Sequence, residues 1–223
     1  MPKFDLIVFD WDGTLMDSAA AIVHAIQSAS RDLRQPIPDD ATARHVIGLG
    51  LEEALRHVAP HLPATQYPEM AARYRHYYLS RDHELTLFAG VRELLIELTE
   101  RGFMLAVATG KSQQGLDRAL DHFGLRPGFQ ALRCADQCPS KPHPQMLFEL
   151  MEELGSAPER TLMIGDTTHD LQMAQNAGTA SIGVSYGAHP ATALQAQNPL
   201  ACVDSVAALR EWFKQADRAG DGA

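Results

Sequence analysis

The stretch of residues 4–15, FDLIVFDWDGTL, constrains the fold more than any other part of the sequence. Its first six residues are apolar except for Asp5, and so short an apolar run suits a buried strand. Asp10 and Asp12 follow at once, and Gly13 allows the backbone to turn sharply there. Unbalanced carboxylates beside a buried strand are unfavourable, and a hard divalent cation such as Mg²⁺ would balance them. Taken alone, this motif is equally compatible with an acidic turn that binds nothing.

Composition and charge narrow the class of protein. The chain has 223 residues, 45% of them hydrophobic and 21% charged, which is ordinary for a globular protein. The formal net charge of −9 argues against nonspecific binding to nucleic acid or to an anionic membrane. No apolar run approaches the ~20 residues of a membrane span, and the N-terminus does not read as a signal peptide. We therefore expect a cytoplasmic protein whose three cysteines are reduced thiols.

Five more apolar runs predict strands, and helical patterns separate them. The predicted strands are residues 103–108, 129–133, Thr161–Gly165, 179–184 and Ala201–Val203. Strands that alternate with helices form a parallel sheet that is covered on both faces. The expected fold class is therefore α/β, with a Rossmann-like, doubly wound parallel sheet in three α/β/α layers.

Residues 17–85 interrupt this alternation, because the region reads as helices only. After Ser18, apolar residues at helical spacing predict a first helix. Further helices are predicted at residues 39–46, Leu51–Val58 and 67–81, and the last of these has an aromatic face. We predict a small all-helical cap domain at 17–85, inserted after the first strand. Residues 1–16 and 86–223 would form the core, and the cap would move about hinges near residues 16–20 and 85–90.

Polar residues follow four of the predicted strands. They are Asp10 with Asp12, Thr109, Lys141 after a longer loop, and Asp166 with Asp170. The carboxyl ends of parallel strands share one edge of the sheet, where ligands bind, so we expect these side chains to converge. Carboxylates suit Mg²⁺, and a hydroxyl, backbone amides at a helix start and a lysine suit phosphate. Phosphoryl transfer needs positioning and charge neutralisation, which these groups supply; one carboxylate can act as the nucleophile and another as general acid and base.

Four motifs in order resemble those of the haloacid dehalogenase (HAD) superfamily. They are DWDGT, the strand that ends in Thr109, Lys141-Pro142, and GDTTHD. Within the superfamily the sequence is most similar to phosphoglycolate phosphatases and their close relatives. The resemblance implies that Asp10 is the nucleophile and Asp12 the general acid and base. It also implies that the Asp10 carboxylate, the Asp12 backbone carbonyl and Asp166 hold Mg²⁺.

The resemblance implies further roles around these residues. Asp170 would orient water or Lys141, while Thr109, Gly110 and Lys141 would hold the phosphoryl group of the substrate. The cap loop that contains Gly48, Leu49 and Gly50 would face the active site and select the substrate.

The sequence does not show where several other charged and polar side chains lie relative to the predicted site. Lys111, Arg44 and Arg56 are cations that would be suited to a carboxylate on the substrate. His143 and His169 lie beside the motifs, and we expect both on loops or at the surface, without a ligand.

The sequence therefore predicts an Mg²⁺-dependent phosphatase that acts on a small phosphorylated metabolite through an aspartyl-phosphate. Phosphoglycolate is the leading candidate. Relatives that cleave carbon–halogen or carbon–phosphorus bonds lack an aspartate at the position of Asp12, which argues against those reactions here. A sugar phosphomutase of the β-phosphoglucomutase type is the alternative, and a non-catalytic phospho-ligand sensor is a third reading. Nothing in the sequence specifies an oligomeric state.

Overall fold

The computed structural model describes residues 4–220 and contains a six-stranded parallel sheet. The strand order β5-β4-β1-β6-β7-β8 confirms the predicted doubly wound α/β class. At the centre, Phe9 of β1 is in register with Val107 of β4 and with Ile164 of β6. The carboxyl ends of these three strands are therefore level with one another. The strands are β1 (Leu6–Phe9), β4 (Met104–Thr109), β5 (Ala131–Cys134), β6 (Thr161–Gly165), β7 (Ala180–Val184) and β8 (Ala201–Val203).

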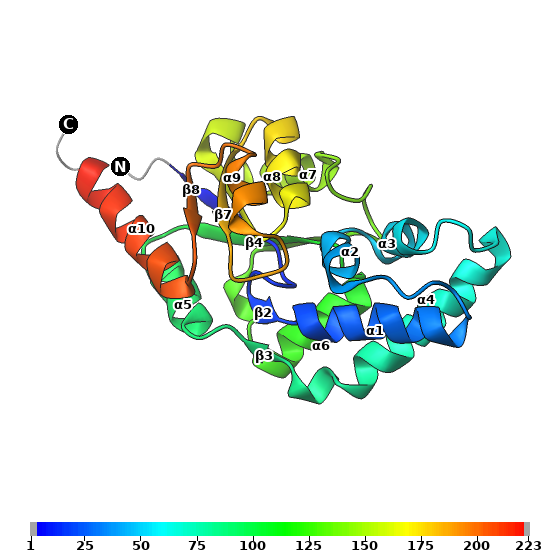
Figure 1. The fold of residues 1–223 in the computed structure, drawn as a ribbon. Coiled ribbons are helices and arrows are strands. Elements are labelled where there is room, and N and C mark those ends of the chain that lie inside the picture. The colour runs from blue at the N-terminus through cyan, green and yellow to red at the C-terminus, as the bar shows by residue number, and fades with distance from the viewer. Residues whose placement is uncertain (1–3, 221–223) are drawn as a thin grey trace.

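Helices cover both faces of the sheet because the strand side chains alternate between two apolar clusters. Leu6 and Val8 pack with α7 and α8, whereas Ile7 and Phe9 belong to the cluster that includes α5, α6 and α10. In Figure 1, α7 and α8 lie above the sheet and α5 and α6 below it. The helices of the core are α5 (Val91–Glu100), α6 (Gln113–Phe123), α7 (Gln145–Leu154), α8 (Thr168–Ala177), α9 (Ala191–Gln195) and α10 (Val206–Gly220).

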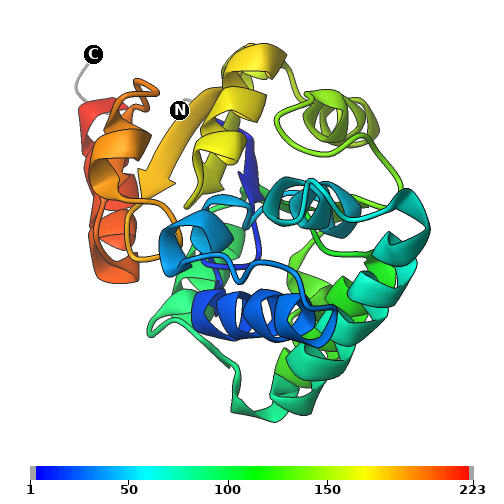
Figure 2. The same ribbon diagram turned by 45° about the vertical axis from the view of Figure 1, so that its right-hand side comes forward.

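Four helices inserted between β1 and α5 gather beyond one end of the sheet (Figures 1 and 2). They are α1 (Ala19–Asp32), α2 (Asp40–His45), α3 (Leu51–Val58) and α4 (Tyr67–Ser80), and they are called the cap from here on. The long helices α1 and α4 pack against each other, which buries Ile22 and Ile26 of α1 and Met70 of α4. The predicted all-helical insert is thus present in the fold.

Two very short strands join the cap to the core, and the sequence did not predict them. Met16 and Asp17 form β2, which pairs in antiparallel orientation with β3 (Thr86–Leu87). The chain therefore enters and leaves the cap at adjacent points.

Short 3₁₀ turns complete the connections at Ala64–Gln66, Asp82–Glu84, Arg126–Gly128 and Pro158–Arg160. All three cysteines are free. Within residues 4–220, no helix has the length and apolarity that a membrane crossing requires.

Candidate active site

The deepest part of the site lies where the strand order reverses, between β1 and β6. Asp10 directly follows β1 and Asp166 directly follows β6, and both side chains are buried. Asp170 approaches from the first turn of α8, so that oxygen atoms of the three carboxylates lie within 4.8 Å of one another. The topology thus brings these acids together from distant parts of the chain.

Lys141 balances part of this negative charge. Its Nζ lies 2.7 Å from Asp10 Oδ1 and 2.7 Å from Asp170 Oδ1, and the lysine side chain is fully buried. Burial disfavours the charged form of Lys141, but the carboxylates of Asp10 and Asp170 outweigh it and raise the pKa of the lysine. Lys141 is therefore a buried cation that holds two carboxylates in one arrangement.

Asp166 is fixed in position by hydrogen bonds to both of its oxygens. Thr14 Oγ1 donates to Asp166 Oδ1 at 2.9 Å, and the backbone N–H of Ala188 donates to Oδ2 at 2.7 Å. Gly13 has a φ of +80°, and a Cβ at this position would lie 2.1 Å from Asp166 Oδ2. Only a glycine therefore fits between the acidic turn and Asp166.

The three buried carboxylates carry more negative charge than Lys141 neutralises. Burial raises the pKa of Asp10 to about 7; Lys141 opposes the shift and Asp170 adds to it. Burial, together with the charges of Asp10 and Asp170, raises the pKa of Asp166 well above its usual range. Asp10 Oδ2 accepts no hydrogen bond from any residue that the structure describes. A further positive charge beside these carboxylates would therefore stabilise their ionised forms.

Thr109 lies at the end of β4, buried, where the next helix begins. Its Oγ1 accepts a hydrogen bond from the backbone N–H of Lys111 at 3.2 Å. Ser112 then serves as the N-cap of α6, because its Oγ accepts from the backbone N–H of Gly115. The hydroxyl of Thr109 and the amides that follow it therefore lie at a helix N-terminus, which is a favourable place for an anion.

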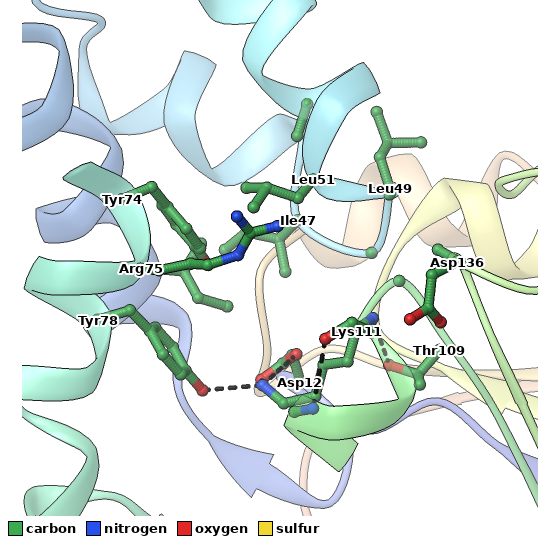
Figure 3. A pocket seen from close by; sticks show the side chains of 18 of the residues that line it. Asp12, Ile47, Leu49, Leu51, Tyr74, Arg75, Tyr78, Thr109, Lys111 and Asp136 are labelled. Atoms are coloured by element: carbon green, nitrogen blue, oxygen red, sulfur yellow. Dashed lines mark hydrogen bonds and ion pairs between the residues drawn. The ribbon is translucent and has the colours of Figure 1, made fainter. Parts of the chain in front are cut away.

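Asp12 lies outside the group of three carboxylates and has its own cation. Lys111 Nζ donates to both Asp12 carboxylate oxygens at 2.9 Å and to the hydroxyl of Tyr78, on α4 of the cap, at 2.8 Å (Figure 3). Ser18 Oγ donates to Asp12 Oδ1 at 2.7 Å, so this hydroxyl binds Asp12 instead of capping α1. Lys111 therefore links the acidic turn of the core to the cap.

The cap loop with Gly48, Leu49 and Gly50 lies directly on the core. A Cβ on Gly110 would be 2.4 Å from the carbonyl oxygen of Leu49 and 2.6 Å from that of Gly48. The backbone N–H of Gly50 donates to Ser140 Oγ at 2.8 Å, next to Lys141. The loop thus contacts segments that follow β4 and β5.

A second contact between cap and core involves three histidines. His169 Nε2 lies 2.7 Å and His189 Nε2 3.1 Å from the backbone oxygen of His45, the last residue of α2. His189 Nδ1 accepts from the backbone N–H of Thr168, so its proton is on Nε2 and points toward the helix end. Burial and the neighbouring His169 lower the pKa of His189 to about 4. Core histidines therefore satisfy a terminal carbonyl of a cap helix.

A cavity of about 490 Å³ opens between the cap and the carboxyl ends of the strands (Figure 3). Asp10, Asp12, Thr109 and Gly110 lie at its core side, and the cap loop and α4 form the opposite side. Lys111 also lines this cavity, whereas Arg44 and Arg56 do not. Arg56 instead pairs with Glu52 at 2.7 Å on the exposed surface of α3.

Some positions differ from expectation. His143 is exposed, as predicted, but His169 is buried against the cap, so the expectation of a loop or surface position for it was wrong. The bridging position of Lys111 and the histidine contacts had no sequence signal, because both depend on how the cap docks. The stacked rings of Tyr74 and Tyr78 agree with the predicted aromatic face, since residues four apart lie on one side of a helix.

Comparisons with known proteins give a consistent picture. Residues 7–184 match the family model described as haloacid dehalogenase-like hydrolase. A probable phosphatase, IndB, of Dickeya dadantii is 39% identical over 206 residues, covering 90% of this chain and 89% of the relative. A phosphoglycolate phosphatase of Vibrio cholerae is 31% identical over 224 residues, with 95% and 97% coverage.

Solved structures agree in fold. A predicted phosphoglycolate phosphatase of Haemophilus somnus superposes with a TM-score of 0.83 at 28% identity, covering 95% of this chain and 98% of that one. A haloacid dehalogenase-like hydrolase of Bacteroides fragilis superposes with a TM-score of 0.84 at 24% identity, with 93% and 100% coverage. The similarity therefore extends over the cap as well as the core.

Proposed function

Because this chain belongs to the haloacid dehalogenase-like hydrolase family, we propose that it is a phosphatase that hydrolyses a small phosphomonoester through an aspartyl-phosphate on Asp10. The observation that carries the proposal is the buried group of Asp10, Lys141 and Asp170 beside Asp166, of which Asp10 lines the cavity. Three separate segments of the chain supply these residues. A structural role alone does not call for a buried lysine among three carboxylates, since burying charge is costly.

The residues present fit Mg²⁺, which prefers oxygen ligands. Asp10 Oδ2 has no hydrogen-bond donor among the described residues, and Asp166 offers a second fixed carboxylate. In this proposal the carboxylates of Asp10 and Asp166 and the backbone carbonyl of Asp12 hold the ion. When bound, Mg²⁺ supplies positive charge that polarises the phosphoryl group.

The proposed reaction has two steps. A carboxylate oxygen of Asp10 forms a bond to phosphorus, and the bond to the leaving oxygen breaks while Asp12 gives that oxygen a proton. Water then attacks the aspartyl-phosphate, Asp12 takes up a proton from it, and the bond between Asp10 and phosphorus breaks to release inorganic phosphate.

Lys141 and Thr109 are proposed to hold the phosphoryl group. Lys141 Nζ forms ion pairs with Asp10 and Asp170, and because a lysine ammonium has three N–H donors, it can also bind a phosphoryl oxygen. The Thr109 hydroxyl and the backbone N–H of Gly110 lie at the start of α6, where an anion is favoured. Asp170 would keep Lys141 in place.

Phosphoglycolate is the first substrate to test, because relatives from Vibrio cholerae and Vibrio vulnificus that are 31% and 32% identical bear the name phosphoglycolate phosphatase. The acidic group of that substrate would lie in the cavity beyond the phosphoryl site, on the side of Lys111.

The test is release of inorganic phosphate from a panel of phosphoesters, with Mg²⁺ and with EDTA. The panel includes phosphoglycolate, hexose phosphates, nucleotides and p-nitrophenyl phosphate. We expect turnover that EDTA abolishes and that falls at least about 10³-fold in Asp10→Asn. Undiminished turnover in a clean preparation of this variant contradicts the chemistry, and conversion of a hexose 1-phosphate into a 6-phosphate identifies a mutase instead.

A further inference from the structure

The cavity is larger than phosphoglycolate requires. Its volume of about 490 Å³ lies within the range of roughly 300–1,000 Å³ that is usual for sites of drug-sized ligands. Phosphoglycolate is a two-carbon acid, and its phosphoryl group would already occupy the floor beside Asp10 and Thr109. Most of the cavity would then lie beyond the substrate.

The wall of that outer part is mainly apolar. Ile47, Leu49 and Leu51 line it on one side, and the stacked rings of Tyr74 and Tyr78, with centroids 5.9 Å apart, line it on another (Figure 3). Such a wall in contact with water is unfavourable, and an apolar ligand would cover it.

Leu79 lines the same cavity from α4 and is 41% exposed, although leucine is usually buried. An exposed apolar side chain in the lining extends the surface that an apolar ligand would cover.

Two arginines line this cavity, Arg75 from α4 and Arg118 from α6, and neither pairs with a side chain that the structure describes. Figure 3 shows Arg75 reaching from α4 into the cavity, and it makes no hydrogen bond or ion pair with any residue for which the structure describes a side chain. Arg73, two residues earlier on the same helix, instead interacts with Asp32 and Glu69 outside the cavity. A guanidinium group binds carboxylates through two parallel hydrogen bonds.

The acidic side chains of the lining determine where an anion can be held. Asp136 accepts hydrogen bonds from the backbone N–H of Gln113 at the start of α6, and Glu52 pairs with Arg56. Glu53 and Asp82 also line the cavity and repel an anion on their sides. Arg75 and Arg118 are therefore the cations of the lining that are left to bind an anionic group of a ligand, and Arg75 is the one that Figure 3 shows beside the apolar wall.

From this arrangement we infer that the substrate is a phosphomonoester whose leaving group is apolar, larger than glycolate, and carries a carboxylate that Arg75 binds. The inference rests on the proposed phosphatase function and specifies its substrate class. The phosphoryl group lies on the core side, the apolar part covers the cap-loop and tyrosine wall, and the carboxylate lies at Arg75.

The experiment compares kcat/KM for phosphoglycolate, benzyl phosphate and 4-carboxybenzyl phosphate in the full chain with Mg²⁺. We expect 4-carboxybenzyl phosphate to exceed phosphoglycolate by at least about tenfold. Arg75→Gln should lower kcat/KM for 4-carboxybenzyl phosphate about tenfold more than for benzyl phosphate, because a charge-assisted pair is lost. The matched control is Arg73→Gln, on the same helix but outside the cavity, which should preserve the ranking of the three substrates.

A second pair of variants tests the apolar wall. Leu79→Asn should lower kcat/KM for benzyl phosphate more than for phosphoglycolate, whereas Ile96→Asn, at an exposed position on α5 outside the cavity, should affect both equally. A wild-type preference for phosphoglycolate overturns the inference, as does an equal effect of Arg75→Gln on both benzyl substrates. If either result is found while p-nitrophenyl phosphate is still hydrolysed, the proposed phosphatase function is retained and only the inferred substrate class is overturned. If no ester releases phosphate, both the phosphatase function and the substrate class are overturned.

Discussion

At the scale of single residues, the site depends on one buried lysine. Lys141 is fully buried and lies 2.7 Å from both Asp10 and Asp170. Removing one member of a buried ionic group leaves its partners uncompensated, which usually costs more than the group contributes when intact. The same residue that would bind the phosphoryl group therefore also stabilises the fold.

Replacing this lysine should destabilise the protein as well as inactivate it. We expect Lys141→Met to lower the free energy of unfolding by about 3–5 kcal/mol at neutral pH without divalent ions. Lys214→Met, which changes an exposed lysine on α10, should stay within about 0.5 kcal/mol of wild type. Urea denaturation measures both, and equal stability of the two variants would show that Lys141 does not balance the carboxylates.

The sequence allowed a prediction of the residues at strand ends but not of the contacts made by the cap. Asp10, Thr109 and Asp166 could be predicted because each directly follows an apolar run, and level strand ends bring them together. The bridge from Lys111 to Tyr78 and the histidines around the end of α2 could not. These contacts depend on the docking of separate elements, which no local periodicity encodes.

At the scale of elements, the cap loop and the start of α6 fit together without spare space. The carbonyl oxygens of Gly48 and Leu49 occupy the volume that a side chain at position 110 would need. The glycine after Thr109 therefore permits the cap loop to lie on the phosphoryl site. This close contact depends on both the cap loop and the glycine at position 110.

A single methyl group should disrupt this fit. In Gly110→Ala the Cβ would lie 2.4 Å from the carbonyl oxygen of Leu49, so the loop must move away. A displacement of about 1 Å near a reacting centre can cost about 10²-fold in rate, and we expect kcat/KM to fall by about 10–100-fold with the secondary structure unchanged. The control is Gly128→Ala, where an added Cβ meets nothing within 4 Å. Equal phosphate release by the two variants would mean that the loop contact is irrelevant to turnover.

Elements were predictable where they are long enough to show a period. The predicted helix Leu51–Val58 and the predicted strand Thr161–Gly165 have the bounds that the structure shows. The strands β2 and β3 have two residues each, and no pattern identifies so short a segment. Their pairing, Met16 with Leu87 and Asp17 with Thr86, forms only because the fold brings the two segments together.

At the scale of the whole molecule, the cap and the core enclose the cavity between them. The proposed boundaries at residues 17 and 85 and the proposed hinges remain predictions, and the β2–β3 pair lies beside both. Closure of a cap excludes water from a reacting phosphoryl group. Motion about these segments would therefore control access to the site.

Limited proteolysis tests this motion. We expect cleavage within residues 16–20 and 85–90 to slow at least severalfold when Mg²⁺ and orthovanadate, a phosphate analogue, are both present, because ligand favours the closed arrangement. Mg²⁺ alone should protect less, since it leaves the cap side of the cavity empty. Cleavage rates that do not respond to the ligand would argue against hinges at these positions.

The β2–β3 pair has one further consequence. The chain enters the cap at β2 and leaves it at β3, and these two strands lie side by side. The four cap helices are therefore attached to the core in the same way as a single surface loop, with both ends at one place. Insertions are tolerated best at sites where the two chain ends are adjacent. The cap can therefore be regarded as an exchangeable module. If a different insert were grafted between Asp17 and Thr86, the core would keep its phosphate chemistry, and the new insert would select a substrate with a different leaving group.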